Sequence, residues 1–97
     1  MTQRDEIVRY LDERLDVRGI DDVSRNGLQV QDAADVRRVG LATDAALATY
    51  RRAVELGCQM LFVHHGLIWG GLRSITGREH DHVRTLLEHD LNLYAAH

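Results

Sequence analysis

The feature that most constrains the fold is a short apolar run, residues 58–63, which ends in His64, His65 and Gly66. The run predicts a buried strand, and the two histidines stand where that strand meets a loop. Imidazole is the commonest protein metal ligand and the usual proton carrier near neutral pH. Such chemistry is typical of strand ends in open α/β sheets. The run therefore predicts a core strand with a candidate site at its end.

Helices and strands are expected to alternate along the chain, because helical spacing of apolar residues gives way repeatedly to shorter apolar runs. The expected order is helix 3–16, strand or loop 28–31, strand 36–42, helix 45–56, strand 58–63, loop 66–77, helix 78–89 and strand 91–96. Strands that alternate with helices imply right-handed crossovers and a parallel sheet. We therefore predict an α/β fold in which a mostly parallel sheet carries helices on both faces.

The last expected strand also ends in a histidine, His97. If the strands 58–63 and 91–96 are parallel neighbours, their tips lie at the same carboxyl edge, and His64, His65 and His97 converge there. No helix follows the last strand, although a parallel sheet needs both faces covered. We therefore expect the domain to be truncated or to depend on a partner.

Composition excludes several classes of protein. The net charge of −3 argues against nucleic-acid binding, and the absence of lysine excludes Schiff-base and P-loop lysine chemistry. A transmembrane helix is not expected, because there is no long apolar run, and the polar amino terminus does not resemble a targeting peptide. A single cysteine, Cys58, cannot form an internal disulfide, which fits the cytoplasm. Its place beside the apolar run favours a packed thiol over a nucleophile.

Four further features have both a structural and a functional interpretation. Asp44 follows an expected strand, and we interpret it as the N-cap of helix 45–56. His80, Asp81 and His82 resemble a chelating tripeptide, but residues two apart on a helix point away from each other, so solvated side chains are favoured. Trp69, among glycines, suits a mobile lid or a substrate-stacking ring, and equally an oligomer interface. Residues 26–30 shape either a site loop or a plain structural turn.

Three segments together resemble one family, the Nif-three-like proteins, often labelled GTP cyclohydrolase I type 2 homologues. The segments are Asn26-Gly27-Leu28-Gln29-Val30, Val63-His64-His65-Gly66-Leu67-Ile68-Trp69-Gly70 and Asn92-Leu93-Tyr94-Ala95-Ala96-His97. They occur in the family's order and extend over nearly the whole chain. Proteins of this family are longer α/β proteins that carry a dinuclear metal centre in a cleft and assemble as a toroidal hexamer.

The resemblance implies roles for particular residues. His64 and His65 match metal ligands, and His97 matches a histidine at the same cleft that transfers a proton or contacts substrate. In the family, an aspartate in a Leu-Pro-Leu-Asp stretch, followed much later by a histidine and a glutamate, completes the centre. Those ligands lie beyond His97, so residues 1–97 match the amino-terminal segment of a single domain, and no second domain is expected.

Two functions are therefore expected. The first is a metal-dependent hydrolase in which two divalent ions activate water for attack on a small, nucleotide-like substrate. The cyclohydrolase label implies opening of the purine ring of GTP. The second is a non-enzymatic metal-binding scaffold or interaction protein. Histidines with carboxylates accept zinc, iron, manganese, cobalt or nickel. A homo-oligomer is expected, without membrane or nucleic-acid partners.

Overall fold

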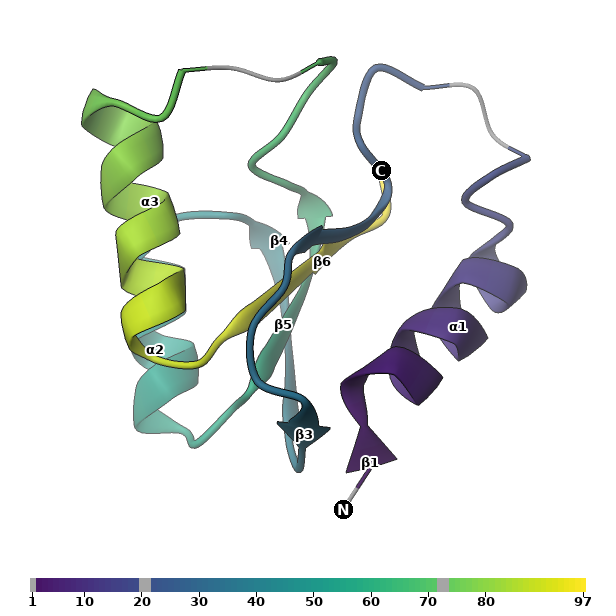
Figure 1. Ribbon diagram of the computed structural model, residues 1–97, viewed down its shortest axis with the longest axis horizontal. Helices are drawn as coiled ribbons and strands as arrows, with labels where there is room; N and C mark the ends of the chain where they lie inside the picture. Colours follow the sequence, from purple (N-terminus) through teal and green to yellow (C-terminus); the bar gives the residue numbers. More distant parts are fainter. Residues whose placement is uncertain (1, 20–21, 72–73) are drawn as a thin grey trace.

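Short strands and helices alternate in the computed structural model, which describes residues 2–19, 22–71 and 74–97 (Figure 1). The elements are β1 (Thr2–Gln3), α1 (Arg4–Leu15), β2 (Gly27–Val30), β3 (Asp35–Val36), β4 (Val39–Asp44), α2 (Leu47–Glu55), β5 (Met60–His65), α3 (Gly77–Glu88) and β6 (Asn92–Ala95). Across these described ranges, none of the helices has the length and apolar character needed to cross a membrane.

One four-stranded sheet, in the order β2-β6-β5-β4, forms the centre of the fold. Strands β4, β5 and β6 are parallel, as the alternation with helices predicts, but β2 runs antiparallel to β6. The sheet is therefore mixed, and the expectation of a mostly parallel sheet holds only in part. The crossover rule governs strands joined through a helix, which describes β4-α2-β5 and β5-α3-β6. Strand β2 has no such connection to its neighbour β6.

Helices cover both faces of the sheet, as predicted: α1 packs on one face, and α2 and α3 pack on the other (Figure 1). Strand β5 shows why, because its side chains alternate between the two faces. Leu61 and Val63 join the core beneath α2 and α3, whereas Met60 and Phe62 pack toward α1. Burial of such side chains contributes about 1.5 to 3 kcal/mol each, so the central strand holds the two layers together.

The ends of α2 show how its boundaries are set. Gly57 follows the helix with φ of +76°, the left-handed conformation in which helices commonly end. The N-cap prediction for Asp44 is wrong: Ala46 caps α2 and makes no side-chain cap hydrogen bond. Asp44 instead continues β4, where it stands opposite His65 in the parallel ladder. Its carboxylate is engaged by that histidine rather than by the helix.

Cys58 is buried in the core, which confirms the packed thiol. His80 and Asp81 are exposed as predicted, but the prediction that His82 is solvated is wrong, because its side chain is buried. His82 lies one helical turn before Leu86 on the inward face of α3. The helix-face argument separated His80 from His82 correctly but assigned both to solvent.

A buried hydrogen bond joins α2 to α3. The hydroxyl of Tyr50 and Nδ1 of His82 are 2.7 Å apart, and the two rings meet edge to face. Desolvation, with a smaller contribution from Arg78, lowers the pKa of His82, while Glu79 and Asp81 oppose the shift. Burial also raises the pKa of Tyr50. Both groups are therefore neutral in the folded protein near pH 7.

We expect this pair to make the folded state sensitive to mild acid. The pKa of His82 is lower in the folded chain than the value of about 6.5 in the unfolded chain. The unfolded state therefore binds more protons as the pH falls, so stability is complete above about pH 7 and declines as the pH falls through 6.5. Urea unfolding at several pH values should show a flatter dependence for His82→Gln. His80→Gln, an exposed change on the same helix, should keep the wild-type slope; equal slopes in all three proteins would contradict the assignment.

Candidate metal centre

Three histidines converge at the carboxyl edge of the sheet. Strands β5 and β6 pair in parallel from Met60↔Asn92 to Val63↔Ala95, so both strands end at the same edge. His64 and His65 close β5, and His97 lies just beyond β6. One ring nitrogen of each histidine lies within 4.8 Å of the corresponding atoms of the other two. The convergence expected from the sequence is therefore confirmed.

The three rings form an open cluster at the protein surface. The rings of His64 and His97 are nearly parallel, with centroids 5.1 Å apart, and the centroid of His65 lies 4.5 Å from that of His64 and 5.6 Å from that of His97. His64 and His97 are exposed and His65 is half-buried. An ion or a small molecule can thus approach the cluster from solvent.

Each of the three imidazoles uses Nδ1 for a hydrogen bond to an oxygen atom. The pairs are His64 with the carbonyl of Ala96 at 3.1 Å, His65 with Oδ1 of Asp44 at 2.7 Å, and His97 with Oδ2 of Asp22 at 2.8 Å. Metal-binding histidines in proteins usually donate their second ring N–H to such an acceptor. The arrangement leaves the Nε2 atoms available to bind a metal.

The segment before β2 holds His97 by its backbone as well as by its ring. Oδ1 of Asn26 accepts a hydrogen bond from the backbone N–H of His97 at 3.0 Å. Oδ1 of Asp22 accepts one from the N–H of Ser24 at 3.1 Å. That backbone hydrogen bond, and next the one from His97, lowers the pKa of Asp22. Asp22 is therefore an ionised carboxylate fixed behind His97.

Sequence reasoning missed both aspartates. Asp44 could have been found, because it follows an expected strand and so belongs to the same carboxyl edge as the histidines. No signal in the sequence pointed to Asp22, which lies in an irregular segment.

Gln29 fastens the loop after β5 to the segment around β2. Its Oε1 accepts hydrogen bonds from the N–H groups of Leu67 at 2.7 Å and Ile68 at 3.0 Å. Its Nε2 donates to the carbonyls of Arg25 at 2.9 Å and Ile68 at 3.1 Å. A Cβ at Gly66 would lie 2.5 Å from the Gln29 side chain. Residues 27–30 are therefore neither a loop nor a plain turn: they form strand β2, and Gln29 of this strand shapes the site.

Trp69 lies beside the cluster rather than apart from it. Its Nε1 donates a hydrogen bond to the carbonyl of Gly66 at 3.2 Å, and its ring meets His97 edge to face with centroids 5.0 Å apart. The indole is half-buried. It therefore forms one wall of the site, while the lid, the stacking ring and the oligomer contact all stay predictions.

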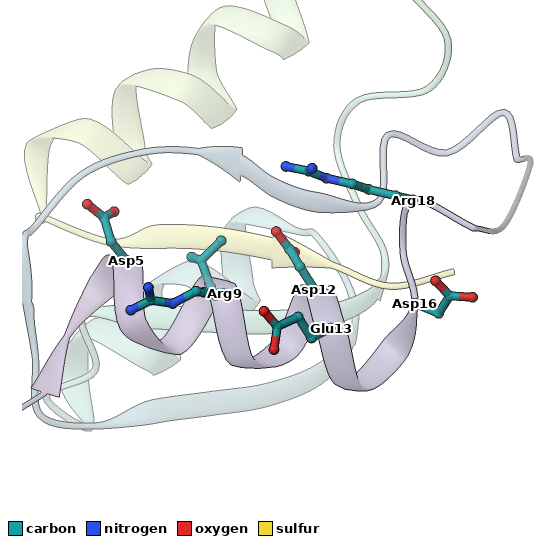
Figure 2. Close-up of a pocket in the computed structure, with 7 residues that line it drawn as sticks. Asp5, Arg9, Asp12, Glu13, Asp16 and Arg18 are labelled. Atoms are coloured by element: carbon teal, nitrogen blue, oxygen red, sulfur yellow. The ribbon is translucent and has the colours of Figure 1, made fainter.

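A separate hollow runs along α1, and Figure 2 shows its charged lining. Carboxylates of Asp5, Asp12 and Glu13 alternate there with Arg9, and Asp12 accepts a hydrogen bond from the Tyr94 hydroxyl at 2.7 Å. None of the three clustered histidines lines this hollow. Charges of both signs on an exposed helix face are typical of a solvated surface, so we interpret this hollow as surface rather than as a second candidate site.

The fold and the cluster together define an α/β protein with a candidate metal centre at the carboxyl edge of its sheet. Residues 2–97 match the family model Duf34/NIF3 (NGG1p interacting factor 3). The chain belongs to this family, as the three sequence segments suggested.

Relatives support the same assignment. Proteins named GTP cyclohydrolase 1 type 2 homolog are 48% identical in Deinococcus radiodurans and 46% identical in Archaeoglobus fulgidus, over 97% and 95% of this chain. The matches cover only 36% and 38% of those proteins, so the chain spans little more than a third of their length. The solved structure of TTHA1606 from Thermus thermophilus has a TM-score of 0.94 and 46% identity, over 99% of this chain and 40% of that one.

A further solved structure, reduced HcgD from Methanocaldococcus jannaschii, matches with a TM-score of 0.84 and 30% identity, over 99% of this chain and 40% of that one. The fold is therefore shared across archaeal and bacterial relatives.

The donor set of the cluster fits a divalent transition ion. Imidazole nitrogens bind such ions at about 2.1 Å, so two nitrogens on one ion stand at most about 4.2 Å apart. The ring nitrogens here lie within 4.8 Å of one another, which small side-chain rotations would close. The two expected ligands, His64 and His65, form an incomplete set, because metal sites use three or four protein ligands.

We expect Gln29→Ala to loosen the wall of the site. The change removes the partners of two N–H groups and two carbonyls, at a cost of about 1 to 3 kcal/mol in the free energy of unfolding. Trp69 is the only tryptophan, so its fluorescence reports this loop alone. Acrylamide should quench it more strongly in Gln29→Ala and equally in Gln31→Ala, an exposed change nearby. Unchanged quenching in both variants would show that Gln29 does not hold the loop.

Proposed function

We propose that this chain carries part of the metal centre of a dinuclear-metal-dependent hydrolase that acts on a nucleotide-like small molecule. His64 and His65 are the proposed metal ligands, and His97 is the proposed catalytic residue. The observation that carries the proposal is the convergence of the three imidazoles at one sheet edge, each with Nδ1 engaged by an oxygen. Zinc, iron, manganese, cobalt and nickel all suit imidazole ligands.

When bound, two divalent ions would supply Lewis-acid activation of water for attack on the substrate. The residues of the chain itself bind the metal, transfer the proton and shield the site in this proposal. His64 and His65 hold the site through Nε2. His97, exposed beside them and fixed by Asp22, takes or gives a proton at Nε2, or orients the substrate by a hydrogen bond from the same atom. Trp69 shields one side of the cluster.

The name of the curated relatives, GTP cyclohydrolase 1 type 2 homolog, suggests the substrate class. We propose GTP or a related purine nucleotide, with opening of the purine ring as the reaction. A toroidal homo-hexamer and a cytoplasmic location belong to the same proposal. The whole protein's activity stays a proposal, because the chain spans little more than a third of those relatives.

A second candidate is a non-enzymatic metal-binding scaffold. The observation that favours it is the family description, NGG1p interacting factor 3, which names an interaction rather than a reaction. Such a protein would bind metal at the same histidines and show no turnover. Metal content therefore tests what the two functions share, and turnover separates them.

Metal content is the first measurement. After dialysis, elemental mass spectrometry should find bound divalent metal in the wild type and a loss of it in His64→Ala/His65→Ala. The double variant His80→Ala/His89→Ala removes the same number of histidines from exposed positions outside the cluster and should keep its metal. Metal that is absent from all three proteins, or equal in all three, would contradict a site at His64 and His65.

Turnover tests the role of His97. In the metal-loaded protein, we expect His97→Gln to slow the hydrolysis of GTP by about 10²- to 10⁴-fold, the usual contribution of a general acid or base, with metal content unchanged. Chromatography of the nucleotide products measures the rate. Loss of metal in His97→Gln would make His97 a ligand instead, and metal without turnover in the wild type would favour the scaffold.

A further inference from the structure

Two carboxylates stand behind the histidine cluster, Asp44 against His65 and Asp22 against His97. We propose that Asp44 and Asp22 are positioning residues that hold His65 and His97 in the tautomer with hydrogen on Nδ1, so that the lone pair of each ring is on Nε2. The purpose of this arrangement rests on the proposed function, since the lone pairs serve as metal ligand and proton acceptor. The tautomers themselves are a property of the metal-free chain.

The chemistry of the partners fixes the location of the hydrogen. A neutral imidazole carries one N–H and one lone pair, and an ionised carboxylate can only accept. A nitrogen 2.7 to 2.8 Å from a carboxylate oxygen is therefore the N–H nitrogen. In both residues that nitrogen is Nδ1, which leaves the lone pair on Nε2.

The backbone positions Asp44 for this contact. Asp44 and His65 are partners in the parallel ladder between β4 and β5, and the N–H of Ala45 donates to the carbonyl of His65 at 2.9 Å. The side chains of Asp44 and His65 are 66% and 45% exposed. Exposed ion pairs contribute only about 0 to 1 kcal/mol to stability, so the contact matters for the orientation of the ring rather than for folding.

Asp22 is held more tightly than Asp44. Its side chain is 16% exposed, and its second oxygen is occupied by the N–H of Ser24. The backbone N–H of His97 donates a hydrogen bond to Oδ1 of Asn26. Ring and backbone of His97 are thus fixed by one short segment that lies far away in sequence.

His64 provides a reference within the same cluster. Its Nδ1 faces the carbonyl of Ala96 at 3.1 Å, and a carbonyl also can only accept. Its tautomer is therefore set by the backbone and does not depend on either aspartate. A change that affects His65 alone, with His64 unaltered, identifies the role of Asp44.

A matched pair outside the cluster separates positioning from ordinary surface pairing. Nδ1 of His80 lies 3.3 Å from Oδ1 of Asp81 on α3, and these side chains are 52% and 65% exposed. Asp81 thus resembles Asp44 in residue type and exposure, but its partner His80 lies outside the histidine cluster. Asp81→Asn makes the same chemical change as Asp44→Asn and removes the same charge.

The test is the tautomer of each histidine in the metal-free chain, measured by ring ¹⁵N NMR at a pH where the rings are neutral. The wild type should show hydrogen on Nδ1 of His64, His65 and His97. In Asp44→Asn the amide group can donate to Nδ1, so the hydrogen of His65 should shift toward Nε2. Asp44→Glu, which keeps an acceptor, should restore the wild-type signal at least in part. Asp81→Asn should leave all three cluster histidines unchanged.

Zn²⁺ affinity provides the second readout. Loss of such a supporting carboxylate lowers metal affinity by about 10- to 100-fold, and we expect a decrease of this size in Asp44→Asn but not in Asp81→Asn. Asp22→Asn should shift the tautomer of His97 alone. Asp22 is more buried than Asp44, so if Asp22→Asn prevents folding, the Asp44→Asn spectra test the positioning role on their own.

Hydrogen on Nε2 of His65 in the wild type, or an unchanged His65 spectrum in Asp44→Asn, would overturn the proposal. The spectra need no metal, so the two claims can fail separately. If the chain shows the expected tautomers but binds no Zn²⁺, the positioning roles are supported and only the proposed function is contradicted.

Discussion

The parallel pairing of β5 with β6 is the constraint on which the site depends. It sets Met60 opposite Asn92 and Val63 opposite Ala95, so the residues that follow both strands meet at one edge. A slip of one residue would exchange the two faces of a strand and expose its core side chains. The register is also fixed by the buried side chain of Asn92, which donates to the carbonyls of Ala33 and Gln59. The core thus determines where the histidines lie.

The direction of β2 explains the second half of the site. Because β2 is antiparallel to β6, its first residue, Gly27, stands opposite Ala95 at the carboxyl end of β6. The residues just before β2 therefore reach the same edge as His97, and Asp22 and Asn26 can bind it. In a fully parallel sheet that segment would start at the opposite edge. Strand β2, whose direction departs from the predicted parallel sheet, thus brings Asp22 to the site.

The sequence predicted those parts of the site that follow from periodicity and connection. The apolar run predicted the strand 58–63. A helix joins this strand to 91–96, and because such crossovers are right-handed and connect parallel strands, the convergence of the three histidines follows. The direction of β2 could not be predicted in this way, since no helix joins it to β6. Asp44 was misassigned because an aspartate between a strand and a helix suits an N-cap equally well. His82 was misassigned because only its spacing from His80 was considered, although its position four residues before Leu86 places it on the apolar face of the helix.

His82 and the three histidines of the cluster differ in their surroundings, and the difference separates a structural histidine from one suited to a binding or catalytic site. All four rings use Nδ1 for a hydrogen bond. His82 is buried, and desolvation lowers its pKa, so it stays neutral between two helices. The cluster histidines have an acceptor behind each ring and solvent in front, with none of them buried. Their positions are dictated by the sheet, yet their exposed side chains add little to its stability. Such a combination, fixed geometry without a folding role, is what a binding or catalytic site requires.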